Sequence, residues 1–343
     1  MRRLVFVTQQ VDPEHPALAA TVRKVQALAA RVDELVVLAD GVVPAVLPAN
    51  CRAHVFGAST RAGRGLRFEA ALVRELAPRP LAVVAHMCPI YAVLAAPLVR
   101  PLRVPLLLWF THWRPSRLLQ AAERVSTRVV SVDRRTLPIP SAKLVPIGHG
   151  IDMDEFSCSE RPARSGLRAL ALGRTSPAKG VDHILRSLVL ARAAGADVEL
   201  DVYGPSFTEE ERRHRAELQE LAAEVGGARI HEAVPRSEVP RLLAESDCLV
   251  NNMRAGATDK VVYEAAASCV PVVASNPAFE DLLDGLELAF PREDERALAE
   301  RLVRLAGLPV EERARLGRTL RERALAGHSV DAWAEKLLEV AAS

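Results

Sequence analysis

Residues 167–180 read LRALALGRTSPAKG, an apolar run that ends directly in a turn bounded by glycines. The run Leu167–Leu172 is apolar except for Arg168, as burial on both faces of a parallel sheet requires. A helical segment over Val181–Ala194 follows, so the stretch predicts a strand, a loop and a helix in succession. This succession is typical of a doubly wound α/β sheet, whose faces are both covered by helices.

The same alternation of short apolar runs and helical segments fills both halves of the chain. In the first half we expect strands at Leu4–Thr8, Glu34–Ala39, Arg52–Phe56, Leu81–Ala85, Pro105–Phe110 and Arg128–Val132, and helices at Ala17–Arg31, Gly65–Leu76 and Ile90–Val99. In the second half we expect strands at Leu167–Leu172, Val198–Tyr203, Arg229–Glu232, Cys248–Val250, Val272–Ala274 and Leu288–Phe290, and helices at Val181–Ala194, Glu209–Val225, Val239–Ala244 and Lys260–Ser268. The sequence therefore predicts an α/β fold of two Rossmann-like doubly wound parallel sheets, which face each other across a cleft.

The length of 343 residues is about twice that of a usual single domain, which favours two domains. The segment Leu137–Ser165 is interrupted by several prolines and glycines, so we place the connector there. The expected domains are residues 1–150 and 151–328. A C-terminal helix over residues 329–343 is expected to pack back toward the first domain.

The overall net charge of +2 argues against a dedicated nucleic-acid-binding protein. Residues 1–150, however, contain 20 Lys and Arg against 9 Asp and Glu, whereas the remainder contains 25 against 34. A basic first half attracts anionic partners such as phosphates, acidic sugars or an anionic bilayer surface. The alternative interpretation is a solvated surface that is simply rich in arginine.

The cysteines are odd in number, widely spaced and without a C-x-x-C pair, which argues against a zinc site or a disulfide framework. They are Cys51, Cys88, Cys158, Cys248 and Cys269. Reduced thiols and a cytoplasmic location fit this pattern. The most apolar stretch, Leu81–Val99, contains His86 and two prolines and reads as a strand and a helix rather than a membrane span. Peripheral contact with the inner face of an anionic membrane stays open.

The turn after Leu172 holds residue types that bind a pyrophosphate. Gly173 and Gly180 bound it, and Arg174 and Lys179 place two cations beside the N-terminus of the following helix. The helix dipole, the N–H groups of the first turn and both cations favour negative charge there. An ordinary strand-to-helix turn with exposed basic residues is the alternative.

Glu264 lies in a helical segment with apolar residues on both sides. A carboxylate beside a phosphate-binding loop is a recurring way to hold ribose hydroxyls. The alternative is a solvated surface glutamate, which the apolar neighbours disfavour.

The chain resembles the GT-B-fold glycosyltransferases of family 4, the retaining group 1 enzymes that use nucleotide-sugar donors. Four segments carry the resemblance in the family's order: Pro146–Asp152, Gly173–Gly180, Val234–Val250 and Glu264–Val273. The resemblance implies a GT-B fold, with an acceptor-binding first domain and a donor-binding second domain.

The resemblance also implies roles for individual residues. In the family, the Arg and Lys of the turn bind the donor diphosphate, which maps onto Arg174 and Lys179. The second glutamate of the paired-carboxylate motif binds the ribose, which maps onto Glu264. The first glutamate, eight positions earlier, holds the donor sugar, and this sequence departs from the family there with Gly256.

Two features near Gly256 are candidates to take over the sugar contact. Asp259 offers a carboxylate three residues later. The backbone N–H groups from Thr258 to Val261 offer hydrogen-bond donors. A different way of holding the sugar, or a protein without activity, is the alternative.

The acceptor side is expected in the first domain. The family has a histidine near the donor sugar, which maps onto His112 and gives it a catalytic role beside Arg174 and Lys179. A packed structural imidazole is the alternative for a histidine between aromatic residues.

The family's glycine-rich loop after the first strand has no counterpart here, because residues 8–16 contain no glycine. Side-chain contacts to the acceptor are therefore expected from Gln9, Gln10 and Asp12. His86, at the end of a predicted strand, is a further candidate for acceptor binding.

The resemblance implies that catalysis needs no bound metal, because the helix N-terminus and the two cations stabilise the departing diphosphate. Asp152 and Asp154 form a nominal D-x-D pattern, which we interpret as acidity of the connector. The expected function is transfer of a sugar from a nucleoside diphosphate sugar to a glycan, lipid-linked or small-molecule acceptor, with retention and no other cofactor. The alternatives are a catalytically inactive nucleotide-sugar-binding or scaffold protein, and an epimerase or phosphorylase on the same fold.

Overall fold

The computed structural model describes residues 2–15, 18–159, 166–256 and 258–343. The chain divides into two compact units, each built on its own parallel sheet. Unit 1 comprises Met1–Asp152 and Gly327–Ser343, and unit 2 comprises Met153–Ala326. The C-terminal residues of the chain therefore belong to the first unit.

Unit 1 contains a seven-stranded sheet in the order β3-β2-β1-β4-β5-β6-β7. Its strands are β1 (Arg3–Val11), β2 (Glu34–Val42), β3 (Cys51–Val55), β4 (Ala82–His86), β5 (Leu106–Trp109), β6 (Arg128–Ser131) and β7 (Leu144–Pro146). Its helices are α1 (Thr21–Ala29), α2 (Arg61–Arg74), α3 (Pro89–Val99), α4 (Arg117–Val125) and α12 (Val330–Ala342).

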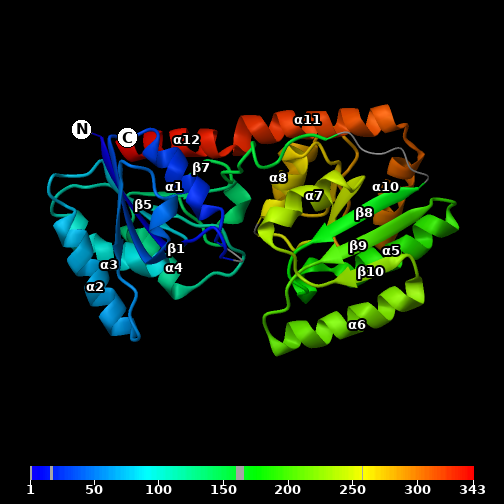
Figure 1. Ribbon diagram of the computed structural model, residues 1–343, viewed down its shortest axis with the longest axis horizontal. Coiled ribbons are helices and arrows are strands. Elements are labelled where there is room, and N and C mark those ends of the chain that lie inside the picture. The colour runs from blue at the N-terminus through cyan, green and yellow to red at the C-terminus, as the bar shows by residue number, and fades with distance from the viewer. Residues whose placement is uncertain (1, 16–17, 160–165, 257) are drawn as a thin grey trace. The chain divides into compact units, whose positions relative to one another are not determined.

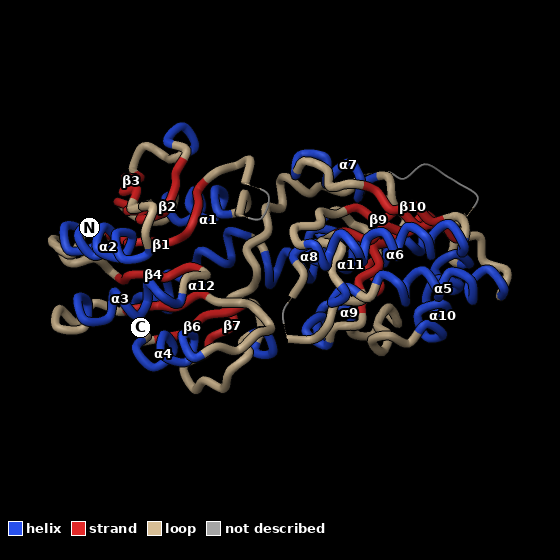
Figure 2. The backbone as a smooth tube through the Cα atoms, turned by 90° about the horizontal axis from the view of Figure 1, so that it is seen from below, coloured by secondary structure: helices blue, strands red, loops and turns tan. Residues whose placement is uncertain are grey.

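Helices cover both faces of the unit 1 sheet, with α2, α3 and α4 on one face and α1 and α12 on the other (Figures 1 and 2). Successive side chains of a strand point to opposite faces, so each strand must be apolar throughout. Val5 and Val7 of β1, for example, belong to the core beneath α2 and α3, and Leu4 and Phe6 are equally buried. This double coverage explains why the strands read as continuous apolar runs.

Unit 2 contains a five-stranded parallel sheet in the order β10-β9-β8-β11-β12. Its strands are β8 (Leu167–Leu172), β9 (Val198–Tyr203), β10 (Ala228–His231), β11 (Cys248–Asn251) and β12 (Val272–Ala274). Its helices are α5 (Val181–Ala193), α6 (Glu209–Val225), α7 (Val239–Ala244), α8 (Lys260–Ala267), α9 (Glu280–Leu283), α10 (Glu295–Gly307) and α11 (Val310–His328), which ends in unit 1. The direction of chain progress reverses between β8 and β11, the position at which doubly wound sheets bind ligands.

The predicted strands are confirmed with one exception. Leu288–Phe290 forms only an isolated bridge, in which Ala289 pairs with Ala274 of β12, and Pro291 follows at once. Strand β7 and helices α4 and α9 were not predicted from the sequence. The helix predicted from Ala17 begins at Thr21, and Ala17 itself lies outside the described residues.

The interpretation of all five cysteines as reduced thiols is wrong for one pair. Cys158 and Cys269 form a disulfide within unit 2, between residues 111 positions apart. Cys51, Cys88 and Cys248 are free. The pair escaped detection because only the folded chain brings the segment before β8 against the end of α8. Residues 160–165 of the predicted connector lie outside the described residues.

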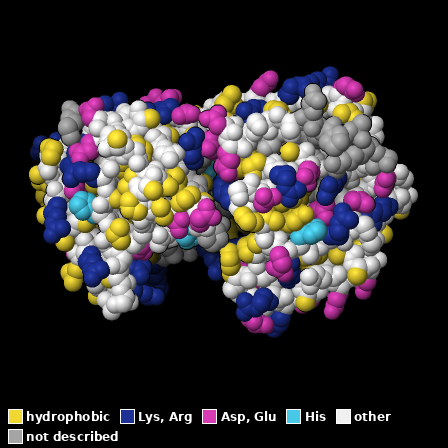
Figure 3. Space-filling model, in the orientation of Figure 1, with side chains coloured by type: hydrophobic (Ala, Val, Ile, Leu, Met, Phe, Trp, Pro, Cys, Tyr) yellow, Lys and Arg dark blue, Asp and Glu magenta, His cyan; other side chains and the backbone are white. Residues whose placement is uncertain are grey.

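The basic excess of residues 1–150 does not gather into one patch on the face seen in Figure 3, where Lys and Arg lie dispersed among Asp and Glu. Within the described ranges, no helix has both the length and the apolar character needed to span a membrane.

Candidate donor site

The turn between β8 and α5 lies at the reversal point of the unit 2 sheet. Gly173 follows the last residue of β8, and a 3-10 turn at Pro177–Lys179 leads through Gly180 into α5. The Ser176 side chain caps the 3-10 turn by accepting a hydrogen bond from the Ala178 N–H at 3.3 Å. The sequence LRALALGRTSPAKG therefore forms the predicted strand, loop and helix.

Both glycines of the turn have a positive φ and lie close to neighbouring side chains. Gly173 has a φ of +139°, and a Cβ there would lie 2.6 Å from Lys179 Nζ. Gly180 has a φ of +56°, and a Cβ there would lie 2.4 Å from Asn252 Nδ2. Glycine tolerates positive φ and leaves this space empty. The Lys179 side chain can therefore lie across the turn, and Asn252 can donate to the Gly180 carbonyl at 3.1 Å.

Lys179 forms an ion pair with Asp259 at the start of α8. Asn251, the last residue of β11, donates from Nδ2 to the same Asp259 oxygen at 2.8 Å. Asn251 ends β11, and Lys179 and Asp259 lie in the connections that follow β8 and β11, the two strands at the reversal point. The structure thus joins Lys179 and Asp259, which are 80 positions apart in the sequence.

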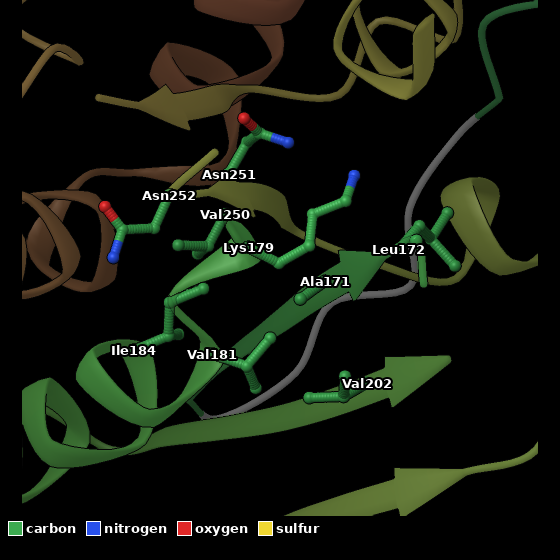
Figure 4. Close-up of a pocket in the computed structure, with 10 residues that line it drawn as sticks. Ala171, Leu172, Lys179, Val181, Ile184, Val202, Val250, Asn251 and Asn252 are labelled. Carbon is green, nitrogen blue, oxygen red and sulfur yellow. The ribbon is translucent and has the colours of Figure 1, made fainter. Parts of the chain in front are cut away.

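A small cavity lies beside Lys179 (Figure 4). Residues from β8, β9, β11 and the start of α5 line it: Ala171, Leu172, Gly173, Lys179, Val181, Ile184, Val202, Val250, Asn251 and Asn252. In Figure 4 the polar ends of Lys179 and Asn251 extend away from the apolar floor of Val181 and Val202. The cavity therefore combines an apolar floor with a polar edge.

Arg174, the second predicted cation, lies with about half of its side chain exposed. Its Nη1 is 3.5 Å from Glu211 Oε1 on α6. The other Glu211 oxygen accepts the Phe207 N–H at 2.7 Å and the Thr208 N–H at 3.3 Å, so the helix start fixes this carboxylate. Arg174 is therefore held at the same edge of the sheet as Lys179, but in reach of solvent.

Glu264 lies on α8 and only 3% of its side chain is exposed. Its Oε1 is 2.8 Å from Arg236 Nη1 and 3.0 Å from Lys260 Nζ. Burial raises the pKa of Glu264, but the Lys260 and Arg236 cations outweigh it and hold the pKa below its ordinary value. Glu264 is therefore an ionised carboxylate with its cations in place.

Arg236 also connects Glu264 to the segment that precedes β8. Its Nη2 lies 3.0 Å from Glu155, and its guanidinium lies 5.3 Å from the centre of the Phe156 ring. Sequence reasoning missed Arg236, Asn251 and Glu211. Asn251 directly follows the strand expected at Cys248–Val250, and Arg236 lies shortly after the strand expected at Arg229–Glu232. These positions were the available signal in the sequence.

Val261 and Gly256 complete the predicted donor-side set. Val261 is a buried residue in the first turn of α8, whose backbone N–H groups lack intrahelical partners by helix geometry. Gly256 has a φ of +98° and contributes no side chain. Of the predicted donor-side residues, the structure brings Lys179 and Asp259 into contact. Arg174 and Glu264 pair instead with other side chains of unit 2.

In unit 1, His112 lies in the loop after β5 and is half-buried. Its ring stacks on Trp113 with the centroids 5.6 Å apart, and its Nδ1 accepts the Arg114 N–H at 3.0 Å. Arg114 in turn lies over the Trp113 ring at 4.4 Å. The loop is therefore an ordered group of aromatic and cationic side chains at the carboxyl edge of the unit 1 sheet.

His86 ends β4, but only 3% of the residue is exposed. Its ring stacks on Trp109 at 4.8 Å and lies 5.2 Å from the Phe6 ring, and Nδ1 is 3.2 Å from the Thr8 hydroxyl. Burial and the nearby Lys24 cation hold the pKa of His86 well below its ordinary value. In this structure His86 is a neutral core imidazole.

Gln9 and Gln10 lie within β1 rather than in the predicted loop, because the strand continues to Val11. Gln9 is exposed, whereas the Gln10 side chain lies against Gly41 of the neighbouring β2. Asp12 begins the loop and accepts the Glu14 N–H at 2.9 Å. Gln9, Gln10 and Asp12 thus share one end of β1.

Asp152 pairs with Arg23 at 2.5 Å in unit 1. Among the residues that the structure describes, no group of three or more His, Cys, Asp or Glu is placed to hold a metal ion.

Comparisons with known proteins give the following relationships. Residues 166–307 match the family model described as Glycosyl transferases group 1. No curated protein matches the sequence. The matched segment contains β8, the glycine-bounded turn, Asp259 and Glu264.

Solved structures match the chain over nearly its whole length. Sucrose-phosphate synthase from Thermosynechococcus elongatus is 17% identical with a TM-score of 0.76, covering 98% of this chain and 97% of that chain. Anabaena HepE in complex with UDP is 15% identical with a TM-score of 0.77, covering 99% of each chain. WaaG, a glycosyltransferase involved in lipopolysaccharide biosynthesis, is 16% identical with a TM-score of 0.67, covering 98% of this chain and 99% of that chain.

These findings confirm the fold predicted from the sequence and the resemblance to the group 1 enzymes. Residues 166–307 carry the match to the Glycosyl transferases group 1 model, and the chain as a whole has the GT-B fold with its two Rossmann-like sheets.

Proposed function

We propose that this chain is a retaining glycosyltransferase of family 4 that transfers a sugar from a nucleoside diphosphate sugar to an acceptor. Unit 2 binds the donor and unit 1 binds the acceptor. The observation that carries the proposal is the pair of cations, Arg174 and Lys179, at the β8–α5 turn. Lys179 contacts Asp259 at the start of α8, the helix that also carries the buried carboxylate of Glu264.

Donor binding follows from the charges at this edge. The diphosphate lies at the N-terminus of α5, where Arg174, Lys179 and the backbone around Gly173 neutralise it. Glu264 accepts hydrogen bonds from the ribose hydroxyls, with Asp259 and Val261 at the start of α8 close to the sugar phosphate. Solved HepE structures that share the fold contain UDP or UDP-glucose, which supports a nucleotide of this type as the ligand.

The reaction breaks the bond between the anomeric carbon and the diphosphate oxygen and forms a bond to the acceptor hydroxyl oxygen. Arg174, Lys179 and the α5 dipole stabilise the charge that develops on the departing diphosphate. The departing phosphate oxygen takes the acceptor proton on the same face, so retention needs no separate base. The helix end and two cations supply the positive charge that a metal ion supplies elsewhere.

The acceptor is a glycan, a lipid-linked group or a small molecule held at the carboxyl edge of the unit 1 sheet. His112 and its stacked partner Trp113 lie there, together with Gln9, Gln10 and Asp12 at the end of β1. The excess of Lys and Arg in residues 1–150 favours an anionic acceptor or one at an anionic membrane.

The proposal is tested by thermal shift with UDP, GDP, ADP and TDP and with their sugar conjugates, since ligands that bind only the folded state raise its stability. We expect one diphosphate and one of its conjugates to raise the melting temperature, and the same conjugate to be consumed with an acceptor. The product's anomeric configuration, read by NMR, should match the donor's. Absence of a shift with every nucleotide contradicts the proposal.

A second candidate function is nucleotide-sugar binding without catalysis. Gly256 favours it, because no side chain is present at that position to hold the donor sugar. This candidate predicts binding without transfer or hydrolysis. An epimerase or phosphorylase would instead convert the nucleotide sugar or a glycan without a separate acceptor.

A further inference from the structure

We infer that Asp259 binds a hydroxyl group of the donor sugar through its outer carboxylate oxygen and thereby selects a neutral sugar over an anionic one. The inference deepens the proposed function and rests on it, because it concerns the same donor site. It assigns to Asp259 a contact that Gly256 cannot make.

Asp259 occupies a helix position at which its carboxylate would normally serve the helix itself. It is the N-cap residue of α8, where an aspartate side chain usually accepts from an N–H of the first turn. Its side chain makes no such bond. The carboxylate is turned instead toward Lys179 and Asn251, at the edge of the cavity beside β8.

The two oxygens of this carboxylate differ in their contacts. Oδ2 receives both the Lys179 ammonium and the Asn251 amide. Oδ1 makes no hydrogen bond or ion pair with any residue in the described part of the chain. Because 19% of the side chain is exposed, a ligand can reach it. The protein thus fixes the carboxylate through one oxygen and leaves the other as an acceptor.

The position of Lys179 relates this oxygen to the donor. An ammonium group has three N–H donors, so Lys179 can keep Asp259 and still donate to a phosphate oxygen. A phosphate bound by Lys179 carries its sugar directly, so the sugar hydroxyls come within reach of the carboxylate that contacts the same ammonium. A hydroxyl donates to an ionised carboxylate in a charge-assisted hydrogen bond.

The charge of Asp259 has two opposite effects on the ligand. The anion lies beside the diphosphate site and opposes a bound diphosphate, but it attracts the hydroxyl protons of a neutral sugar. A uronic acid on the donor would bring a second carboxylate next to Asp259, and like charges in close contact repel. Asp259 therefore favours a nucleoside diphosphate sugar whose sugar is neutral and bears free hydroxyls.

The test uses Asp259→Asn in the full chain, with calorimetry on the nucleoside diphosphate and the neutral-sugar conjugate that the wild type binds. We expect the diphosphate to bind as well as, or more tightly than, in the wild type, because one opposing charge is gone. We expect the conjugate to lose about tenfold or more in affinity relative to the diphosphate, the size of a hydrogen bond to a charged group. The matching glycuronosyl donor should gain relative to the neutral one.

Asp182→Asn is the matched control, because it removes an equal charge from the first turn of α5. Asp182 pairs with Arg186 at 3.0 Å. It should change the affinities for diphosphate and conjugate by the same factor. Asp259→Ser, which removes the carboxylate and keeps a cap-forming side chain, serves as a second variant if Asp259→Asn folds poorly.

The possible outcomes distinguish a failure of the Asp259 role from a failure of the proposed donor binding. If the wild type binds no nucleotide, the proposed function fails. If it binds both ligands and the Asp259 variants leave their affinity ratio unchanged, the donor function stands and the role of Asp259 is overturned. A wild type that binds a glycuronosyl donor better than the neutral one also overturns it.

Discussion

Each unit places a lysine near the carboxyl edge of its sheet, and the two lysines have different surroundings. In unit 2, Lys179 crosses the turn above Gly173 and pairs with Asp259, a carboxylate with one oxygen still in reach of solvent. In unit 1, Lys24 of α1 is only 4% exposed and its ammonium lies 4.1 Å from the centre of the Trp109 ring and 4.9 Å from that of Trp333. The first lysine is placed for a ligand, and the second is enclosed by the core.

Two histidines near the unit 1 edge also differ in how accessible they are. His86 is stacked on Trp109 inside the core, whereas His112 lies in the following loop beside Trp113 and Arg114. A histidine or lysine near the carboxyl edge of a sheet is therefore a binding residue only where its surroundings leave it accessible. Substitutions at the two edges test whether the unit 1 edge is packed core and the unit 2 edge is a charged site.

The largest effect is expected at the enclosed edge. Trp109→Ala removes an indole that contacts His86, Lys24 and Trp333, and it should lower the free energy of unfolding of unit 1 by about 3–5 kcal/mol. Denaturant unfolding measures this loss. Trp109→Phe is the control and should lose much less, because most of the packing volume stays. A loss below about 1 kcal/mol for Trp109→Ala would contradict the description of the unit 1 edge as packed core.

The donor edge depends on a covalent link that unit 1 lacks among its described residues. The disulfide Cys158–Cys269 joins the segment before β8 to the end of α8. Cys158→Ser should lower the stability of unit 2 by about 2–4 kcal/mol, because the unfolded chain regains the freedom of a long loop. A thermal melt with and without reductant measures it. Cys158→Ser should melt alike in both conditions, whereas the control Cys51→Ser keeps the disulfide and should lose stability with reductant as the wild type does. Equal melting temperatures for Cys158→Ser and the wild type would show that the disulfide does not stabilise unit 2.

The next effect concerns binding rather than folding. Lys179→Ala should weaken nucleoside diphosphate binding by about 10- to 100-fold, because a charge-assisted contact to phosphate is lost. Nucleoside affinity and the unfolding transition should stay close to wild type. Calorimetry with the diphosphate and with the nucleoside separates the two ligands. Arg186→Ala, a cation on α5 outside the turn, is the control, and an equal loss for both ligands contradicts the assignment of Lys179.

The smallest effect is a pH dependence at Glu264. Arg236→Gln removes a cation that lowers the pKa of Glu264, so this pKa rises in the variant. A carboxylate is ionised above its pKa, so the variant should lose nucleoside affinity at a higher pH than the wild type as the pH falls from 7 to 4. The difference should be at most about tenfold. Arg241→Gln, whose arginine pairs with Glu238 and Glu245 at the surface, should follow the wild-type profile.

Several elements were predictable because their causes are local. The apolar run Leu167–Leu172 and the helix over Glu209–Val225 have the bounds expected from the sequence. Helix α4 was missed although Ser116 precedes it and accepts the Leu119 N–H, a cap that the sequence shows. Strand β7 contains Pro146 and lies in the proline-rich segment, so its pairing with β6 was not visible locally.

The two doubly wound sheets and the cations of the donor loop could be predicted from local sequence, because strand burial, glycine turns and helix starts depend on neighbouring residues. Four features could be seen only in the folded chain. They are the ion pairs Lys179–Asp259 and Arg236–Glu264, the disulfide Cys158–Cys269 and the burial of His86. Each of these depends on residues from separate strands and helices meeting in the folded chain. Burial and ion pairing decide whether a charged group is available to a ligand, and both arise only when these elements pack together.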